Sequence, residues 1–209
     1  MRDHEETQPA LVVPPEYFGS QSFAASLVCS PGRIAIDTTA IYRKQSFQNR
    51  CRIRTPDGLL WLSVPVRRTG HRLAVCDLAI DNDAQWSKKH WRSLEFNYRS
   101  CPYFEFYEPA IAPLYRRHWE SLASFTVATV LVVAEALDVT VTVLSGQQND
   151  PSQNAGASTE GFRKQGSYVE PPYQQNFGQH LAGTSVIDML FNIGPTTRDV
   201  LSKAFTKVT

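Results

Sequence analysis

The chain has 209 residues, which suits one large domain or a domain with an extension. Its 42% hydrophobic and 20% charged residues are ordinary for a soluble globular protein, and its net charge of +1 does not call for a polyanionic partner. Four widely spaced cysteines without a CxxC pair argue against a zinc cluster and favour thiols in a reducing cytosol. We therefore predict a cytoplasmic protein without a metal site, and we leave its cofactor open.

The first elements are short and apolar. Residues 1–10 are polar and are predicted to be a disordered tail. Leu11 to Val13 predicts a buried strand that stops at two prolines, and residues 17–27 predict a short helix. Residues 33–36 predict a second strand, which delivers Asp37 at its end.

The clearest local prediction is a β-hairpin from Arg50 to Val66. Two alternating runs flank Thr55-Pro56-Asp57-Gly58, in which Pro sets φ and Gly accepts a positive φ. The second arm is almost entirely apolar, so we expect both of its faces to be covered. A further strand is predicted at residues 73–80.

Helical patterns dominate the second half of the chain. Residues 86–99 predict a helix, and about residues 110–137 predict a long amphipathic helix. The strand 139–144 follows, and Glu135 and Asp138 within the most apolar window argue against a membrane span. Beyond it we expect a helix capped by Thr184 and a short helix at about 196–205.

These elements divide the chain into the tail at residues 1–10 and three further parts of one domain. Residues 11–144 form the α/β core, and residues 173–209 form a C-terminal helical element that completes it. Between them, residues 145–172 are rich in Ser, Gln, Asn and Gly and are predicted to be a flexible loop or insert. The predicted fold is α/β: a mixed sheet with a central hairpin, flanking helices and a long polar loop.

The positive charge of the chain is local. From Arg43 to Arg72 eight Lys or Arg residues face one acid, Asp57, so this segment carries +7 while the rest of the chain sums to −6. A solvated hairpin face and an anion site for phosphate, carboxylate or nucleotide both explain this. Gln45 and Asn49 lie among apolar residues that look buried, and unpaired polar groups in such places are costly unless they serve a site.

One face of the predicted helix 86–99 joins Trp86, His90, Ser93 and Asn97 beside the core stripe. A histidine placed like this is more often a hydrogen-bonded, half-buried residue than a catalyst, and both interpretations stay open. The sequence contains no GxGxxG, GxxxxGK[ST], HExxH or GxSxG motif, which lowers the case for the chemistry of each.

Three runs of the chain resemble a known family. They are the segment from Ile36 to Val66 (D…IYRKQSFQNRCRIRTPDGLLWLSVPV), residues 86–109 (WSKKHWRSLEFNYRSCPYFEFYEP) and residues 173–195 (YQQNFGQHLAGTSVIDMLFNIGP). In this order they are similar to the WbqC-like family. The resemblance implies an α/β fold and a context of O-antigen and other surface polysaccharide gene clusters in bacteria. It carries over these motif positions: Lys44, Gln45, Asn49, Arg50, Trp86, His90, Tyr98, Pro102, Tyr103, Phe104, Gln175, Asp188 and Gly194.

The chain departs from the family pattern near its start. The family commonly opens with Gln-Pro ahead of an aromatic residue, and here Pro14-Pro15-Glu16-Tyr17 takes that place. The acidic position after the second strand is Asp37 alone, followed by two threonines. If that amide contacts the substrate in the family, this protein either uses a different group for the contact or is impaired.

The resemblance and the local charge together lead to a functional hypothesis. We expect an enzyme that acts on an activated sugar or a similar anionic small molecule, possessing transferase or sugar-nucleotide-modifying activity. The candidate catalytic residues are His90 and Asp37, and the candidate substrate-binding residues are Lys44, Gln45, Asn49, Arg50, Trp86, Tyr98, Tyr103 and Gln175. The alternative is a non-enzymatic binding or assembly protein whose basic hairpin holds RNA or an acidic partner, and the low net charge argues against nucleic acid.

The predicted site requires four side chains to meet. Lys44, Asn49, Arg50 and His90 are expected to converge on one pocket, with a bend at residues 46–48 that brings them together. Arg54, at the tip of the hairpin, is expected to be exposed and to matter little.

Overall fold

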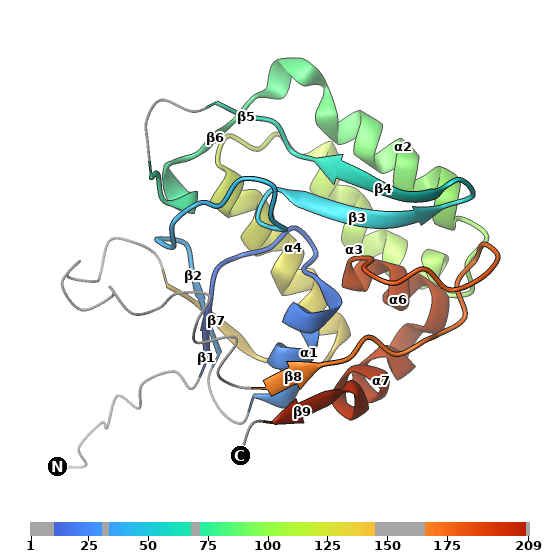
Figure 1. The fold of residues 1–209 in the computed structure, drawn as a ribbon. Helices are drawn as coiled ribbons and strands as arrows, with labels where there is room; N and C mark the ends of the chain where they lie inside the picture. Colours follow the sequence, from blue (N-terminus) through green and yellow to red (C-terminus); the bar gives the residue numbers. More distant parts are fainter. Residues whose placement is uncertain (1–10, 31–33, 68–71, 145–165, 208–209) are drawn as a thin grey trace, which may run out of the picture.

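A computed structural model describes residues 11–30, 34–67, 72–144 and 166–207. The domain is α/β, as predicted. Figure 1 shows a small parallel sheet at one end of the molecule and a β-hairpin with helix α2 (Trp86–Tyr98) at the other, with α4 (Leu122–Ala136) running between them. The predicted tail 1–10 and most of the predicted loop, residues 145–165, lie outside the described residues.

The parallel sheet has three strands: β1 (Leu11–Val13), β2 (Ile34–Asp37) and β7 (Val141–Leu144). Their order is β1-β2-β7, so β2 is central and its end lies beside that of β7. Parallel neighbours need crossover connections, which here contain α1 (Gln21–Cys29) and α4. Apolar side chains of both helices pack with those of the strands in one cluster, which includes Phe23, Leu27 and Val130.

Helix α1 begins four residues later than predicted. The Oγ of Ser20 accepts a hydrogen bond from the Phe23 amide at 3.2 Å, which makes Ser20 the N-cap. Before it the chain turns sharply, because Phe18 and Gly19 both have positive φ. A Cβ on Gly19 would lie 2.6 Å from the Phe23 ring, so this turn needs glycine.

The predicted hairpin is confirmed. Strands β3 (Arg50–Thr55) and β4 (Gly58–Ser63) pair antiparallel, with Thr55 opposite Gly58 across the predicted turn. Cys51, Ile53 and Leu62 face the core. The expectation that both faces of the second arm are covered is wrong, since Leu59 and Leu60 are 38% and 41% exposed. Within the described residues the hairpin is a two-stranded sheet of its own.

The predicted strand 73–80 is mostly replaced by other structure. A 3₁₀ turn, Val75–Asp77, is followed by the short strand β6 (Ala79–Ile80), which pairs with β5 (Val66–Arg67). A second 3₁₀ turn, Asn82–Ala84, leads into α2.

The single long helix predicted at 110–137 is wrong. The structure has two helices, α3 (Phe104–Arg116) and α4, separated by residues 117–121. The chain leaves α3 in an extended conformation at Arg117, the Trp119 indole donates to the Leu114 carbonyl at 2.7 Å, and Ser121 caps α4. Apolar periodicity continues across the break, because both helices face the same core.

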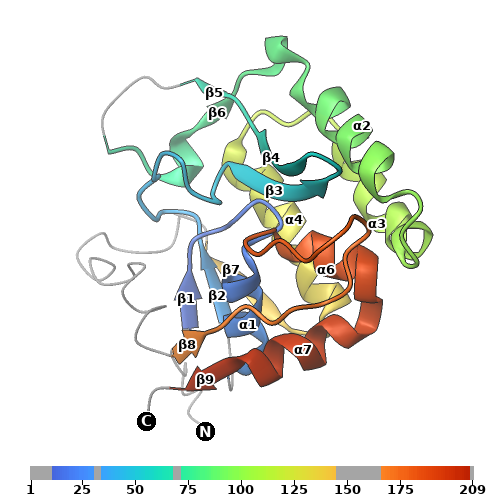
Figure 2. The ribbon, with the colours of Figure 1, turned by 45° about the vertical axis from the view of Figure 1, so that its right-hand side comes forward.

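The C-terminal element packs against the rest of the domain. Strand β8 (Gly166–Tyr168), at the end of the predicted flexible loop, pairs antiparallel with β9 (Phe205–Lys207). Helix α6 (Val186–Ile193) is almost fully buried, and its N-cap is Ser185 in place of the predicted Thr184. After a 3₁₀ turn at Gly194–Thr196, α7 (Thr197–Ala204) lies beside α1 (Figure 2). No helix of the described residues is long and apolar enough to span a membrane.

Candidate functional site

Two acidic residues follow the carboxyl ends of β1 and β2, where open α/β sheets bind their ligands. Asp37 ends β2 and is buried. Its Oδ1 accepts hydrogen bonds from the Thr39 amide at 2.8 Å and from the Thr39 hydroxyl at 2.6 Å. The other acid, Glu16, follows β1 after two prolines. The predicted candidate Asp37 therefore lies at the carboxyl edge of the sheet, where Thr39 holds its carboxylate.

The carboxyl group of Glu16 is half-buried at the start of α1. It accepts hydrogen bonds from the amide of Ser20 at 2.8 Å and from its hydroxyl at 3.2 Å. Burial raises the pKa of Glu16 to about 7, and these two hydrogen bonds only partly oppose the rise. A carboxyl group in this state exchanges its proton near neutral pH, as a general acid or base requires.

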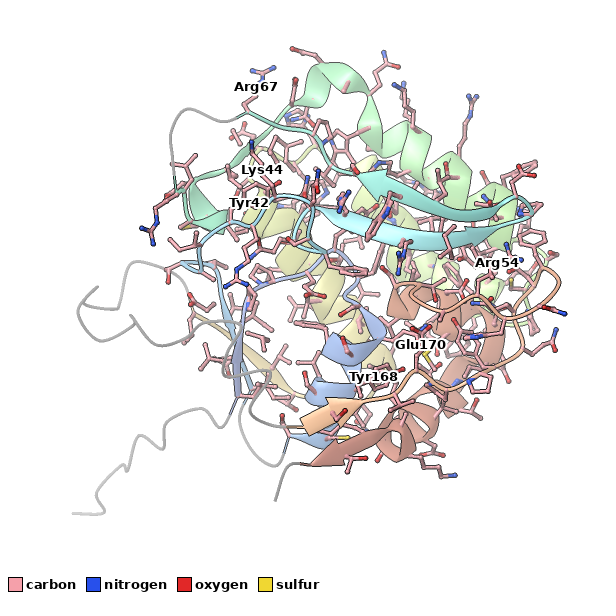
Figure 3. The ribbon with its side chains drawn as sticks, in the orientation of Figure 1. Tyr42, Lys44, Arg54, Arg67, Tyr168 and Glu170 are labelled. Atoms are coloured by element: carbon pink, nitrogen blue, oxygen red, sulfur yellow. The ribbon has the colours of Figure 1, made fainter. Side chains whose placement is uncertain are left out.

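The basic loop between β2 and β3 lies beside Glu16. The Tyr17 amide donates to the Phe47 carbonyl at 2.8 Å, which ties the loop to the segment after β1. Lys44 is exposed on this loop, as Figure 3 shows. Gln45 is exposed as well and has a φ of 58°, so the expectation that it is buried is wrong. The buried amides of this segment are Asn49, as expected, and Gln48, whose Oε1 accepts from the Arg43 amide at 2.6 Å.

The first arm of the hairpin presents two arginines around one tryptophan. The Cζ atoms of Arg50 and Arg52 lie 4.2 and 4.8 Å from the Trp61 ring centroid, within the range of cation–π attraction. Phe47 meets the same ring edge-on, with centroids 5.2 Å apart. The Nε of Arg50 is buried and has no hydrogen-bond partner, although its guanidinium also donates to the Gln45 carbonyl.

A third segment closes this arrangement. The Ser185 amide donates to the Arg52 carbonyl at 2.7 Å, and the Ser185 Oγ accepts from the Arg52 amide at 3.0 Å. Ser185 also forms a β-bridge with Ser20, the partner of the Glu16 carboxylate. These contacts make a closed circuit through three distant segments, which we call the contact ring: Glu16, Phe47, Arg50, Arg52, Trp61 and Ser185.

Asn49 lies next to the contact ring but points elsewhere. Its Nδ2 donates to the Val64 carbonyl at 2.9 Å, and its Oδ1 is buried without a hydrogen-bond partner. Arg50 and Asn49 thus each keep one unsatisfied polar atom at the same end of the hairpin. Such atoms are costly unless a ligand or water pairs with them.

Arg54 is buried, and the expectation that it is an exposed tip residue is wrong. Its side chain is 6% exposed, and its guanidinium donates to the Phe177 carbonyl at 2.9 Å and to the Gly58 carbonyl at 3.2 Å. Figure 3 shows it at the far end of the hairpin from Lys44. The segment around Phe177 covers this end, so Arg54 serves to hold the two parts together.

Trp86 and His90 lie in the aromatic core. His90 Nδ1 is 3.0 Å from the hydroxyl of Tyr17, which in turn is 2.6 Å from the Tyr115 hydroxyl. The His90 ring also hydrogen-bonds the backbone of Ser63. Burial lowers the pKa of His90 to about 4, so the imidazole is neutral at pH 7.

Tyr98 and Gln175 meet at a buried carboxylate, Asp188. The Tyr98 hydroxyl donates to Oδ1 at 2.5 Å, Gln175 Nε2 donates to Oδ2 at 3.0 Å, and the Tyr173 hydroxyl donates to Oδ2 as well. We call these four residues the clasp. Burial raises the pKa of Asp188, and the three hydrogen bonds oppose that rise.

The clasp continues toward α1 through a second acid. Gln21 Nε2 donates to Glu170 Oε1 at 2.9 Å and to Thr184 Oγ1 at 2.9 Å, while the Gly183 amide donates to Glu170 at 2.7 Å. Figure 3 shows Glu170 on the C-terminal segment beside α1. The network links the C-terminal segment to α1, and the clasp links it to α2.

Tyr103 packs against the C-terminal element. It is half-buried at the start of α3, its amide donates to the Phe191 carbonyl at 3.1 Å, and its ring lies against Gly194. Gly194 has a φ of 56°, so both space and backbone conformation favour glycine there.

The part of the chain that matches a known family contains every residue of the contact ring except Ser185. A family model described as the WbqC-like protein family matches residues 15–160, which is more than half of the chain. The chain belongs to the WbqC-like protein family. A protein of Mycobacterium tuberculosis named "Uncharacterized protein Rv1507c" is 26% identical over 192 residues, covering 77% of this chain and 83% of that protein. No solved structure matches.

The predicted WbqC-like motif residues fall into separate groups. Asn49 and Arg50 lie together at the open end of the hairpin, and His90 touches Ser63, which is paired with Arg50. His90 is in the core, however, and Lys44 is exposed on the loop. The chain turns through residues 44–49, so Lys44 and Arg50 do not share a strand. The predicted pocket of these four stays a prediction, and the structure joins only part of it.

Sequence reasoning missed five of the six members of the contact ring as site residues: Glu16, Phe47, Arg52, Trp61 and Ser185. Arg52 and Trp61 are directly opposed in the hairpin register, so the predicted hairpin already implied their contact. The sequence marks Glu16 only weakly, as an acid between apolar residues in the N-terminal segment that departs from the family pattern. Among the described residues, no group of three or more His, Cys, Asp or Glu is arranged to hold a metal.

Proposed function

We propose that the protein is a cytoplasmic enzyme of surface polysaccharide (O-antigen) biosynthesis that acts on an activated sugar or a similar anionic small molecule. Its membership of the WbqC-like family supports the pathway. The contact ring supports the ligand class, because it places two arginines against Trp61 and connects that ring, through Phe47, to the segment that carries the ionisable carboxyl group of Glu16.

The observation that carries the proposal is that the contact ring contains both an unpaired cationic donor and a carboxyl group with a raised pKa. Arg50 keeps a buried, unpaired Nε, which a phosphate or carboxylate oxygen satisfies with a charge-assisted hydrogen bond. Burial raises the pKa of Glu16, on another segment of the ring, to about 7, so its carboxyl group can gain or lose a proton near neutral pH. The ring therefore combines anion binding with proton transfer.

We assign each residue one role. Arg50, with Lys44 from the exposed loop, binds the anionic group. Gln45 and Asn49 are kept only as predictions for orienting the ligand, because the Asn49 amide nitrogen already donates to the Val64 carbonyl. Glu16 moves the proton. Asp37 stays a second candidate for proton transfer, because it ends the neighbouring strand.

His90 is retained only as a prediction for catalysis. Its ring already contacts Tyr17 and the backbone of Ser63, so it reaches a substrate only when one of these contacts opens. The non-enzymatic alternative, with RNA on the basic hairpin, loses support because Arg52 and Arg54 are engaged by backbone carbonyls of the C-terminal segment.

The test is a thermal-shift screen of sugar nucleotides, sugar phosphates and nucleotides. A ligand at 100 times its dissociation constant stabilises the fold by about 2.7 kcal/mol, which is readily measured. The variant Arg50→Ala should lose this stabilisation. Lys203→Ala, an exposed cation on α7, should keep it. A ligand that stabilises Arg50→Ala as well as the parent protein would exclude the contact ring as its site.

A further inference from the structure

The outer face of α2 carries a surface furrow that no part of the proposed function uses. Three hollows adjoin along the helix, and each shares residues with the next: Lys88 and Trp91 join the first two, and Arg92 and Glu95 join the last two. A 13-residue helix is about 20 Å long, so the hollows form one elongated groove. We call it the α2 furrow, and its charged and aromatic residues are Lys88, Lys89, Trp91, Arg92, Glu95, Phe96, Arg99, Arg116, Arg117 and His118.

The charge of the α2 furrow is strongly one-sided. Six Lys or Arg residues line it against a single acid, Glu95, whereas the whole chain carries a net charge of +1. Glu95 already pairs with Arg99 at 2.5 Å. Within the described part of the chain, Lys88, Arg92 and Arg116 make no salt bridge, although Arg67 and Arg198 on other surfaces do.

The positions of the cations oppose the stability of the helix. The first turn of α2 contains Lys88 and Lys89 and no acid. The positive end of a helix dipole disfavours cations there, and an exposed helix usually carries Asp or Glu in its first turn. A solvated face chosen for stability would show the opposite pattern, which points to a role for this charge.

Two aromatic side chains accompany the cations. Phe96 is 82% exposed in the last hollow, and Trp91 is half-buried between the first two. Trp91 packs on Tyr115 and Phe104 from inside, with ring centroids 5.8 and 6.1 Å away. An isolated solvent-exposed phenylalanine gains nothing from the core of this domain.

We propose that the α2 furrow binds a single strand of nucleic acid. Cations along an elongated groove track successive phosphates, and exposed aromatic rings stack on unpaired bases. In this arrangement Lys88, Arg92 and Arg116 contact phosphates, while Phe96 stacks on a base. An acidic polypeptide would use the cations but leave Phe96 without a planar partner. The low net charge of the chain argues against nucleic acid from the sequence alone, whereas the charge that lines this furrow is six cations against one acid.

The experiment measures binding of fluorescein-labelled U12 RNA and T12 DNA by anisotropy between 50 and 200 mM NaCl. With these three phosphate contacts the slope of log K against log[salt] is about −2.1, which is about an 18-fold loss across this range. Each of Lys88→Gln, Arg92→Gln and Arg116→Gln should make the slope shallower by about 0.7. Phe96→Ala should weaken binding about 5- to 150-fold without changing the slope.

Lys203→Gln is the matched control, because it removes one exposed cation from α7 and leaves the furrow intact. Its slope should equal that of the parent protein. A slope change as large as that of Lys88→Gln would mean diffuse attraction and overturn the proposal. Equal binding of poly-glutamate and U12, with no effect of Phe96→Ala, would assign the furrow to an acidic polypeptide instead. All of these side chains are exposed, and circular dichroism of each variant confirms the fold.

Discussion

The contact ring and the clasp are both built from polar side chains that join distant segments, yet they differ in how well those side chains are paired. In the clasp, the Asp188 carboxylate accepts three hydrogen bonds, and the donors are buried or half-buried. At the contact ring, Arg50 keeps an unpaired Nε and the adjacent Asn49 keeps an unpaired Oδ1. A satisfied buried network stabilises a fold, whereas an unsatisfied buried group is costly unless a ligand or water pairs with it. We therefore expect the clasp to control stability and the contact ring to control binding.

The largest expected effect is the loss of the clasp. Asp188→Ala leaves the buried Tyr98 hydroxyl without its acceptor, and an unpaired buried group costs about 1–3 kcal/mol. Tyr173 and Gln175 each lose one of their hydrogen bonds as well. The free energy of unfolding should fall by about 3 kcal/mol or more in urea titrations. Glu120→Ala, at an exposed position, should change it by less than about 0.5 kcal/mol. Similar losses of unfolding free energy in the two variants would contradict the expectation that the clasp controls stability.

The next effect concerns the pH dependence of the contact ring. The pKa of Glu16 is raised from 4.5 to about 7, so the folded protein favours the protonated carboxyl group. This contribution to stability is complete below the unfolded pKa and is lost as the pH rises through about 7, with a loss of at most about 3 kcal/mol.

Glu16→Gln should remove this part of the pH dependence, because an amide does not titrate. Asp188 and Glu170 also have raised pKa values and act in the same direction, so the informative quantity is the difference between the two proteins. Urea unfolding at pH 5 and pH 8 measures it. Identical pH dependence in the parent protein and the variant would show that Glu16 titrates in its ordinary range.

Two arginines on strand β3, Arg50 and Arg54, allow effects on ligand affinity and on stability to be tested separately. Arg50→Ala removes a charge-assisted contact, and we expect a loss of about 1.5–3 kcal/mol in ligand affinity, or about 10- to 150-fold. Arg54→Ala should leave affinity unchanged and lower stability by about 1–3 kcal/mol, because the Phe177 and Gly58 carbonyls lose their donor. Calorimetry with a ligand from the screen and urea unfolding of both variants test this. Equal affinity losses would favour a diffuse basic face over the contact ring.

The smallest effect is expected on the outer side of the second hairpin arm. Leu60 is 41% exposed, so Leu60→Ser should change the free energy of unfolding by less than about 1 kcal/mol. Leu62→Ser, on the buried side of the same strand, should cost several times more. A large effect of Leu60→Ser would indicate that another surface covers this arm.

Local sequence determined much of the fold of this protein. The hairpin follows from the Thr55–Gly58 turn, in which each residue suits its own backbone angles. Helix α2 follows from a periodic apolar stripe, and strands β1, β2 and β7 follow from short β-branched runs. The uneven charge between residues 43 and 72 is also visible in the sequence, and Arg50 lies within that segment.

Tertiary structure alone decided how these parts meet. The pairing of Arg52 with Ser185 spans 133 residues, and the Tyr17 amide reaches the Phe47 carbonyl in a loop without regular structure. Neither contact has a period or a spacing that a sequence reveals. The burial of Arg54 by the segment around Phe177 is likewise not visible in the sequence. Neither is the break between α3 and α4, because the apolar pattern continues across it. Burial depends on which distant surface packs on a residue, and sequence periodicity reports only which side of its own element that residue occupies.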